Sequence, residues 1–381
     1  MITQEFPDIL DDDIPEGFDE EEIDPLGTIV SPFDPTQIRV DRKTPTIDLL
    51  TDRIQHGEIN LAPDFQRKGG IWNNDAKSRL IESILIRIPL PAFYVDATDE
   101  NLWLVVDGLQ RLTTLKNFVV DGTHELSGLE FITELNGKKF ADLPRNLQRR
   151  IKETEVTVFL IQPGTPPEVK FNIFKRINTG GMPLSTQEIR NAINGERVRN
   201  FVKALVDSPS FQTATGGKIG DKRMADRECV CRFLAFEIVP PSEYQGKDLD
   251  SFINRSMQKI NDPDECPENT LRELGQLFDK TMKRANRLFG KFAFRKYHGP
   301  GRRMMPISKA LFESVSHGLA RLTDEEAEHL IRHRKAVLEA YGQLMADKEF
   351  EKSVSQATGD AGQVKRRFSK IIGLFQSFNT P

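Results

Sequence analysis

The segment "LWLVVDGLQRLTTLKNFV", residues 102–119, limits the folds open to this chain more than any other stretch. An apolar run typical of a buried strand ends at Asp107-Gly108, and apolar residues then recur at the spacing of a helix. Glycine permits a sharp turn at such a boundary. The segment therefore predicts a strand that passes directly into a helix, within a domain that mixes both.

The rest of the chain extends this pattern. Ser185 followed by Glu188 is the signature of a helix capping box. After a proline-containing linker near residues 31–45, we predict helices over 46–61, 74–88, 109–119, 167–181 and 185–208, and strands over 92–97, 102–107 and 155–162. Later patterns are nearly all helical. The predicted fold class is α+β, with a mixed domain over residues 40–195 followed by a mostly α-helical domain over 196–381.

The N-terminal residues differ in composition from the rest. Residues 1–25 hold eleven Asp or Glu and no Lys or Arg, which leaves 53 basic against 46 acidic residues elsewhere. Such a stretch buries little apolar surface, so residues 1–30 are predicted to be a disordered acidic tail. It is either a solubilising tail or a strip that competes with nucleic acid for a basic surface. Its apolar members would also suit a short docking peptide: Phe6, Ile9, Leu10, Ile14 and Phe18.

Several protein classes are disfavoured by what the sequence lacks. It has no apolar run of the roughly 20 residues that span a bilayer, and its start lacks the pattern of a signal peptide. We therefore expect a cytoplasmic protein with no membrane partner, whose three cysteines are reduced thiols. It has no P-loop, so any nucleotide site must be of another kind.

An arginine in the first turn of the helix at 109–119 is unexpected, because helix N-termini carry partial positive charge. Gly108 admits a ligand close to the backbone, and the free N–H groups with Gln110 and Arg111 suit a phosphate or carboxylate. Thr113 and Thr114 would add hydroxyl groups. Alternatively, Arg111 pairs with an acidic side chain, for which Asp107 is the local candidate. The residues themselves leave both readings open.

Two further segments combine cations, small polar donors and glycines. One places Gln66 and Arg67 beside Gly69-Gly70, and the other precedes the Gly180-Gly181 turn with Lys175, Arg176, Asn178 and Thr179. Either segment alone is weak evidence for a phosphate clamp. Together with the strand–helix junction they suggest one pocket for a polyanion.

These three blocks resemble the GmrSD-type family, which is related in fold to ParB and sulfiredoxin. "DGLQRLTTL" resembles the family's DGQQR motif, "FQRKGGIWNNDAKSRLIESILIRIPLPAFYV" its QR…W…LIxSIL…PxP block, and "FKRINTGGMPLSTQEIRNA" its F-x-R-x-N-x-G…L-x-x-x-E-x-R block. The blocks occur in order over about residues 45–205. The resemblance implies a ParB/sulfiredoxin-like fold whose motif binds the phosphates of a nucleotide, and NTP hydrolysis linked to restriction of phage DNA.

Carried over by position, the resemblance implies catalytic roles for Asp107, Gln110 and Arg111. It places Gly108 in the same motif and Gln66, Arg67 and Asn178 around it. With the residues that the clamp chemistry adds, the expected nucleotide-binding residues are Gln66, Arg67, Gly108, Thr113, Lys175, Arg176, Asn178 and Thr179. Asp107 would hold Mg²⁺, and Glu188 would cap its helix or orient a water. Leu109 departs from the family because it replaces the first glutamine of DGQQR. If that amide positions the attacking water, hydrolysis here would be weak while binding survives.

The second half offers a possible DNA surface. Basic groups cluster in residues 220–233, 294–305 and 363–370, and Phe294 or Tyr297 could stack on a base. The alternative is that these are ordinary solvated helix faces. His329 and His333 stand at helical spacing in a polar context that does not favour a metal site, and Cys229 and Cys231 lack a second pair for zinc.

The expected function is therefore that of an NTPase or NTP-gated switch in anti-phage restriction. The alternative is a DNA-binding regulator that does not hydrolyse nucleotide. The expected partners are a nucleotide, DNA, a separate nuclease subunit and further copies of the chain. Nuclease activity within this chain is not supported, because Asp107 is the one evident member of an acid cluster.

Overall fold

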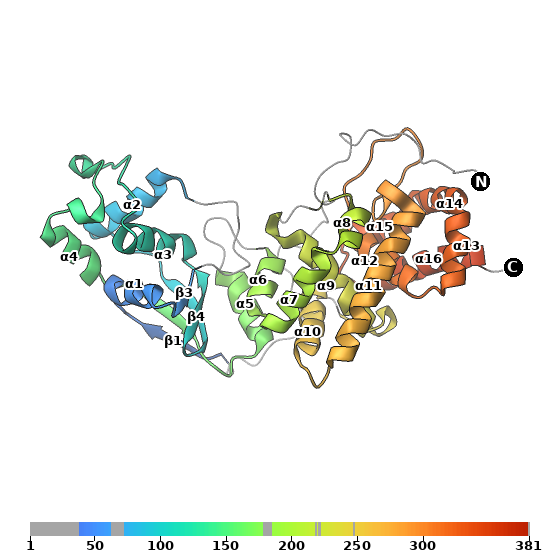
Figure 1. Cartoon of the computed structure of the whole chain (residues 1–381), viewed down its shortest axis with the longest axis horizontal. Coiled ribbons are helices and arrows are strands. Elements are labelled where there is room, and N and C mark those ends of the chain that lie inside the picture. Colours follow the sequence, from blue (N-terminus) through green and yellow to red (C-terminus); the bar gives the residue numbers. More distant parts are fainter. Residues whose placement is uncertain are drawn as a thin grey trace. The chain divides into compact units, whose positions relative to one another are not determined.

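The computed structural model describes residues 38–61, 72–177, 185–217, 219, 222–246 and 248–379. The predicted acidic tail, Gln66, Arg67, Asn178 and Thr179 lie outside these residues. The chain divides into two compact units, with the boundary between Ile193 and Asn194. The first is α+β and the second is helical (Figure 1), which confirms the predicted fold class.

The first unit is built on a five-stranded mixed sheet in the order β1-β5-β3-β4-β2. Pairing is antiparallel for β1 with β5 and for β3 with β4, and parallel for β3 with β5 and for β2 with β4. The strands are β1 Val40–Lys43, β2 Ile59–Asn60, β3 Phe93–Asp99, β4 Leu102–Asp107 and β5 Val158–Ile161.

Alternating side chains divide this sheet into two faces. Phe93, Val95 and Val105 belong to a core shared with the helices gathered on one side of the sheet (Figure 1). These helices are α1 Ile47–Gln55, α2 Asn74–Leu85, α3 Leu109–Leu115 and α4 Arg145–Glu153. On the other face Tyr94 stacks on Phe159 with ring centroids 4.9 Å apart. Helix α3 runs on into a π-helical turn, Lys116–Val120.

Several element boundaries differ from the sequence prediction. Gly57, at φ +73°, ends α1 early, so Ile59 lies in β2 and not in a helix. Helix α2 ends at Leu85, three residues before the prediction. The predicted linker contains β1, an exposed edge strand that pairs with β5. The predicted helix at 185–208 is two helices, α6 Thr186–Ile193 and α7 Glu196–Val206, and the helix begun at Pro167 is α5 Pro167–Ile177.

The second unit packs its helices around one large apolar core. Among the described residues its α-helices after α7 are α8 Pro209–Thr215, α9 Ala225–Ile238, α10 Leu249–Asn261, α11 Glu268–Phe289, α12 Lys309–Ala320, α13 Asp324–Arg332, α14 Arg334–Ala346, α15 Lys348–Ser355 and α16 Ala361–Asn379. No helix in the described part of the chain is long and apolar enough to cross a membrane.

Glu82 on α2 fixes a loop of the first unit. Its carboxylate accepts three backbone N–H bonds, from Glu130 (3.1 Å), Phe131 (2.7 Å) and Ile132 (3.0 Å). Burial alone raises the pKa of Glu82, but these bonds together hold the pKa below its ordinary value. A carboxyl whose pKa is lowered on folding stabilises the protein above its unfolded pKa, and that stabilisation is lost as pH falls through the folded pKa.

Replacing the Glu82 carboxylate should change the stability of the first unit in a way that depends on pH. Glu82→Gln is expected to lower the free energy of unfolding of the first unit by about 1–3 kcal/mol at pH 7, because one acceptor oxygen becomes a donor. The difference should shrink as pH falls from the ordinary glutamate pKa of about 4.3 through the lower pKa of the folded protein, where the wild-type carboxyl becomes protonated. Trp72 and Trp103, the two tryptophans of the chain, both lie in this unit, so their fluorescence reports its unfolding. Glu130→Gln, at an exposed side chain, is the matched control.

Candidate functional site

Gly108 makes the junction between β4 and α3. It is the N-cap of α3 and adopts φ +99°, in the left-handed region that favours glycine. A Cβ atom at this position would lie 2.4 Å from Cδ1 of Phe93. Both the turn and the close approach of Phe93 therefore require glycine here. No side chain caps α3, so backbone N–H groups of its first turn are left without a capping acceptor.

Arg111 is buried inside this junction, with 8% of its surface exposed. Nη2 donates to Oδ2 of Asp107 at 2.8 Å and to the carbonyl of Ala92 at 3.1 Å, and Nη1 donates to the carbonyl of Pro91. The guanidinium carbon lies 4.5 Å from the centre of the Phe93 ring. The structure therefore contains the ion pair between Arg111 and Asp107, which is one of the two alternatives that the sequence left open. These bonds use three of the five N–H groups of the guanidinium, so a phosphate would have to reach the other two on a side chain that is only 10% exposed.

The electrostatics of the pair reflect its burial. Burial raises the pKa of Asp107, and the adjacent Arg111 guanidinium offsets only part of that effect. Burial likewise lowers the pKa of Arg111, against the influence of Asp107. The carboxylate is nevertheless accessible, because 30% of the Asp107 side chain is exposed. The first turn of α3 itself holds no acidic residue.

Gln110 connects the junction to the segment that carries the QR block. Its Oε1 accepts a hydrogen bond from the backbone N–H of Trp72 at 3.4 Å. Thr114 donates its hydroxyl to the carbonyl of Gln110 at 2.7 Å, so this threonine is occupied within the helix. Thr113 is half-buried on the same turn.

The third block places its residues on two helices. Lys175 and Arg176 are exposed on the last turn of α5, where cations favour the helix dipole. Glu188 forms the predicted capping box: its N–H donates to Oγ of Ser185 at 3.1 Å, and its carboxylate accepts from the Ser185 N–H at 2.5 Å. Capping is thereby confirmed as a role of Glu188. Both helices belong to the first unit, as the junction does.

The sequence did not indicate a buried ion pair that lies on the face of the sheet opposite helices α1 to α4. Nζ of Lys170 on α5 lies 2.9 Å from Oδ2 of Asp96 on β3 and also contacts Thr98. The pair ties α5 to the sheet. A signal for it is the charged Asp96 within the otherwise apolar strand "FYVDAT", since buried charges are normally paired.

The structure corrects the proposed DNA surface of the second unit. Phe294 and Tyr297, expected to stack on bases, are 1% and 6% exposed and lie in the core. Three of the expected cations are also buried: Arg232 and Arg367 bond to the carboxylate of Glu313, which is itself fully buried, and Arg295 donates to the carbonyl of Met305. These side chains stabilise the interior of the helical unit and do not form a surface for DNA. Arg302, Arg303 and Lys365 remain exposed.

His329 and His333 contact each other, and the three cysteines are buried thiols. The rings of His329 and His333 lie 4.4 Å apart, and Nδ1 of His333 is 2.9 Å from the His329 carbonyl. Within the described ranges, no three His, Cys, Asp or Glu side chains come together as a metal would require. The cysteines Cys229, Cys231 and Cys266 are free and buried, and burial raises the pKa of Cys229 well above its ordinary value.

Gly108→Ala tests how the junction is built. We expect the variant to lose about 2–4 kcal/mol of unfolding free energy in the first unit, from backbone strain and from displacement of Phe93. Gly122→Ala is the matched control, because Gly122 has φ +62° but a Cβ there would meet nothing within 4 Å. Tryptophan fluorescence during urea unfolding measures both. Equal losses in the two variants would show that Phe93 does not constrain the junction.

Comparison with known proteins identifies this unit. Residues 47–194 match the family model of the GmrSD restriction endonuclease, N-terminal domain. Neither the curated proteins nor the solved structures contain a match. The matched range starts at α1, ends one residue after α6, and includes the whole β4–α3 junction. Residues 47–194 of this chain are therefore a domain of the GmrSD N-terminal family.

Proposed function

We propose that this domain binds a nucleoside triphosphate at the β4–α3 junction and acts in the restriction of phage DNA. The restriction setting follows from the family, which is named for a restriction endonuclease. The ParB-like fold implied by the resemblance is part of the same proposal. DNA cleavage is assigned to a separate nuclease subunit.

The hydrogen bond between Trp72 and Gln110 is the observation that carries the nucleotide site. It holds Trp72, in the same block as Gln66 and Arg67, against the first turn of α3, although Trp72 and Gln110 are 38 residues apart. The uncapped N–H groups of that turn attract anions. Two of the three blocks thus converge on one place, and Lys175, Arg176, Asn178 and Thr179 would complete the clamp.

A magnesium ion fits the carboxylate that the junction offers. Asp107 presents a partly exposed carboxylate, and Mg²⁺ bound with a nucleotide typically takes one or two carboxylates together with phosphate oxygens. The ion would arrive with the phosphates, which Asp107 by itself would repel. Bound there, it would neutralise phosphate charge.

Arg111 then has a positioning role. Its bonds fix the carboxylate of Asp107, the first turn of α3 and the carbonyls of Pro91 and Ala92 in one arrangement. A preorganised site loses less free energy on binding than one that must be ordered by its ligand. The phosphates would be met by the backbone of α3, Gln110 and Thr113, with Arg111 behind Asp107.

Leu109 favours a second candidate, a switch or DNA-binding regulator that binds nucleotide without hydrolysing it. The side chain packs against the core of the first unit. It has no polar atom with which to orient an attacking water, and Gln110 already accepts a bond from Trp72. Arg302, Arg303 and Lys365 are among the exposed cations that would be available for DNA in this case.

Calorimetric titration separates these outcomes. We expect the full chain to bind at least one of ATP, GTP, CTP and UTP more tightly with Mg²⁺ than without it. Asp107→Asn should remove that magnesium dependence, because the amide keeps the shape but loses the charge. Asp99→Asn, at the other end of the same β3–β4 hairpin, should behave like wild type.

Phosphate release by the same samples then distinguishes enzyme from switch. Release by wild type that is lost in Asp107→Asn supports hydrolysis, and binding without release supports the switch. Well-folded wild type that binds none of the four nucleotides would refute the nucleotide site.

A further inference from the structure

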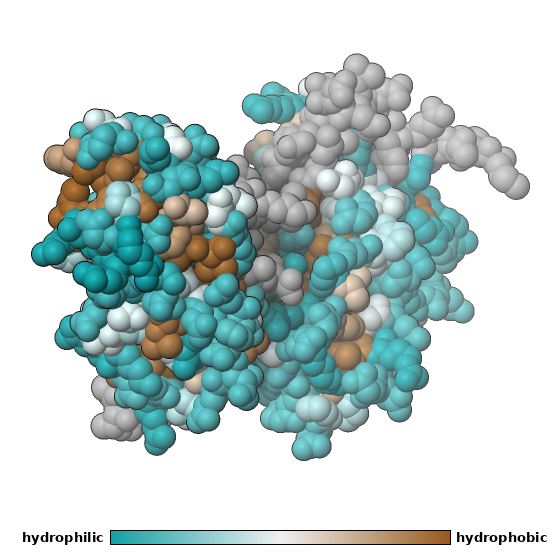
Figure 2. Space-filling view, turned by 60° about the vertical axis from the view of Figure 1, so that its left-hand side comes forward, coloured by the Kyte–Doolittle hydropathy of each residue, from teal (hydrophilic) through white to brown (hydrophobic). Residues whose placement is uncertain are grey.

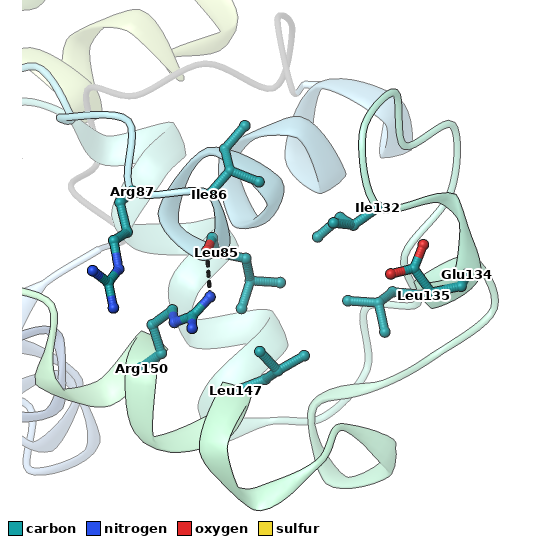
Figure 3. A pocket seen from close by; sticks show the side chains of 8 residues that line it. All are labelled: Leu85, Ile86, Arg87, Ile132, Glu134, Leu135, Leu147 and Arg150. Carbon is teal, nitrogen blue, oxygen red and sulfur yellow. Dashed lines mark hydrogen bonds between the residues drawn. The ribbon is translucent and has the colours of Figure 1, made fainter.

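A cavity of about 300 Å³ opens in the first unit away from the β4–α3 junction. Figure 3 shows it between the end of α2, the loop that follows residue 130, and α4. Its floor and walls are apolar: Leu85, Ile86, Ile132, Leu135 and Leu147. None of these residues belongs to the proposed nucleotide site.

The apolar surface continues beyond the cavity. Ile88 and Phe131, each next in sequence to a lining residue, are 50% and 71% exposed. Hydrophobic residues also reach the surface of this unit on the left of Figure 2. The three N–H bonds from residues 130–132 to Glu82 hold the loop that carries Phe131 and Ile132 in place. A preformed, exposed apolar site of this kind is typical of a surface that binds a partner.

The charges at the rim are separated. Arg87 and Arg150 lie at one side of the cavity and Glu134 at the other (Figure 3). Arg150 lines the cavity and uses Nη1 to donate to the carbonyl of Leu85 at 2.9 Å. The side chain of Arg87 forms no hydrogen bond or ion pair with another described residue, and its backbone adopts φ +65°. An occupant should therefore be apolar along one side and acidic on the other.

Residues 6–18, "FPDILDDDIPEGF", have this composition. Phe6, Ile9, Leu10 and Ile14 recur at the spacing of one helical face, and acids fill the positions between them. Pro7 is suited to the first turn of a helix. Amphipathic helices commonly bind apolar grooves through such i, i+3, i+4 anchors. The 19 residues between Phe18 and Ile38 can extend over about 65 Å, so chain length does not prevent the contact.

We propose that the acidic N-terminal segment of the chain docks into this cavity. Phe6, Ile9 and Leu10 fill the space between Ile86, Ile132 and Leu147, and the aspartates at 11–13 face Arg87 and Arg150. The proposal is independent of nucleotide binding. It gives the acidic segment a specific intramolecular site in place of a general solubilising role.

Photo-crosslinking in the full chain tests the contact. A benzoylphenylalanine at Leu10 is expected to form crosslinks to residues 85–88, 131–135 or 147, located by mass spectrometry. The same probe at Glu22, beyond the docking segment, should give much less of these products. Crosslinks from position 10 to other surfaces, or none, would overturn the proposal.

Two charge variants test whether the rim charges contribute to docking. Arg87→Glu should lower the crosslink yield by about fivefold, the effect of reversing one charge opposite several carboxylates. Glu134→Lys should raise the yield, because it removes the one acid of the rim. Unchanged tryptophan fluorescence will verify that both variants fold. Equal yields in both variants would contradict electrostatic docking.

A mixture of ¹⁵N-labelled and unlabelled chains identifies the source of the segment. Crosslinks confined to uniformly labelled or unlabelled species support docking within one chain. Mixed species would overturn that assignment and show that the segment belongs to a second copy.

Discussion

The buried guanidinium of Arg111 organises the N-terminal domain around the end of β4. A buried charge is costly unless it is paired and hydrogen-bonded. Arg111 meets this requirement with the carboxylate of Asp107, the carbonyls of Pro91 and Ala92, and the ring of Phe93. One side chain thereby links the end of a strand, the start of a helix and the loop that enters β3. Gly108 lies in the same cluster, since a Cβ there would meet Phe93 at 2.4 Å and Nη2 of Arg111 at 3.3 Å.

This arrangement gives the D-G-x-Q-R pattern a physical meaning beyond ligand contact. Asp107 and Arg111 are four residues apart and pair across the turn that Gly108 permits. Gln110 extends the network to Trp72. A motif of this kind can be required for function because it builds the site. In the proposed nucleotide site, the ligand would meet backbone N–H groups and the exposed part of Asp107 rather than Arg111. Loss of activity on mutation of Arg111 would therefore not identify a phosphate contact.

The features that the sequence predicted correctly are mainly those fixed by residues close together in the chain. The strand ending at Asp107, the helix starting at Leu109 and the Ser185–Glu188 box each depend on neighbours within a few residues. Strand β1 was missed because "VDRK" is exposed along its whole length and has no apolar alternation. The Lys170–Asp96 pair spans 74 residues, and local patterns do not encode it. Phe294, Tyr297 and Arg367 were misassigned because a basic stretch looks the same whether tertiary contacts bury it or leave it solvated.

A double-mutant cycle on Asp107→Ala and Arg111→Met tests the central claim most directly. The free energy of unfolding of the first unit would be followed by tryptophan fluorescence. If Arg111 is the internal anchor, Arg111→Met alone should cost about 3–5 kcal/mol, because it leaves a carboxylate and two carbonyls unpaired. The double variant should then cost less than the sum of the singles by 1 kcal/mol or more, on the order of contacting residues. Additive effects within about 0.5 kcal/mol would contradict the account and return Arg111 to the role of a free ligand contact.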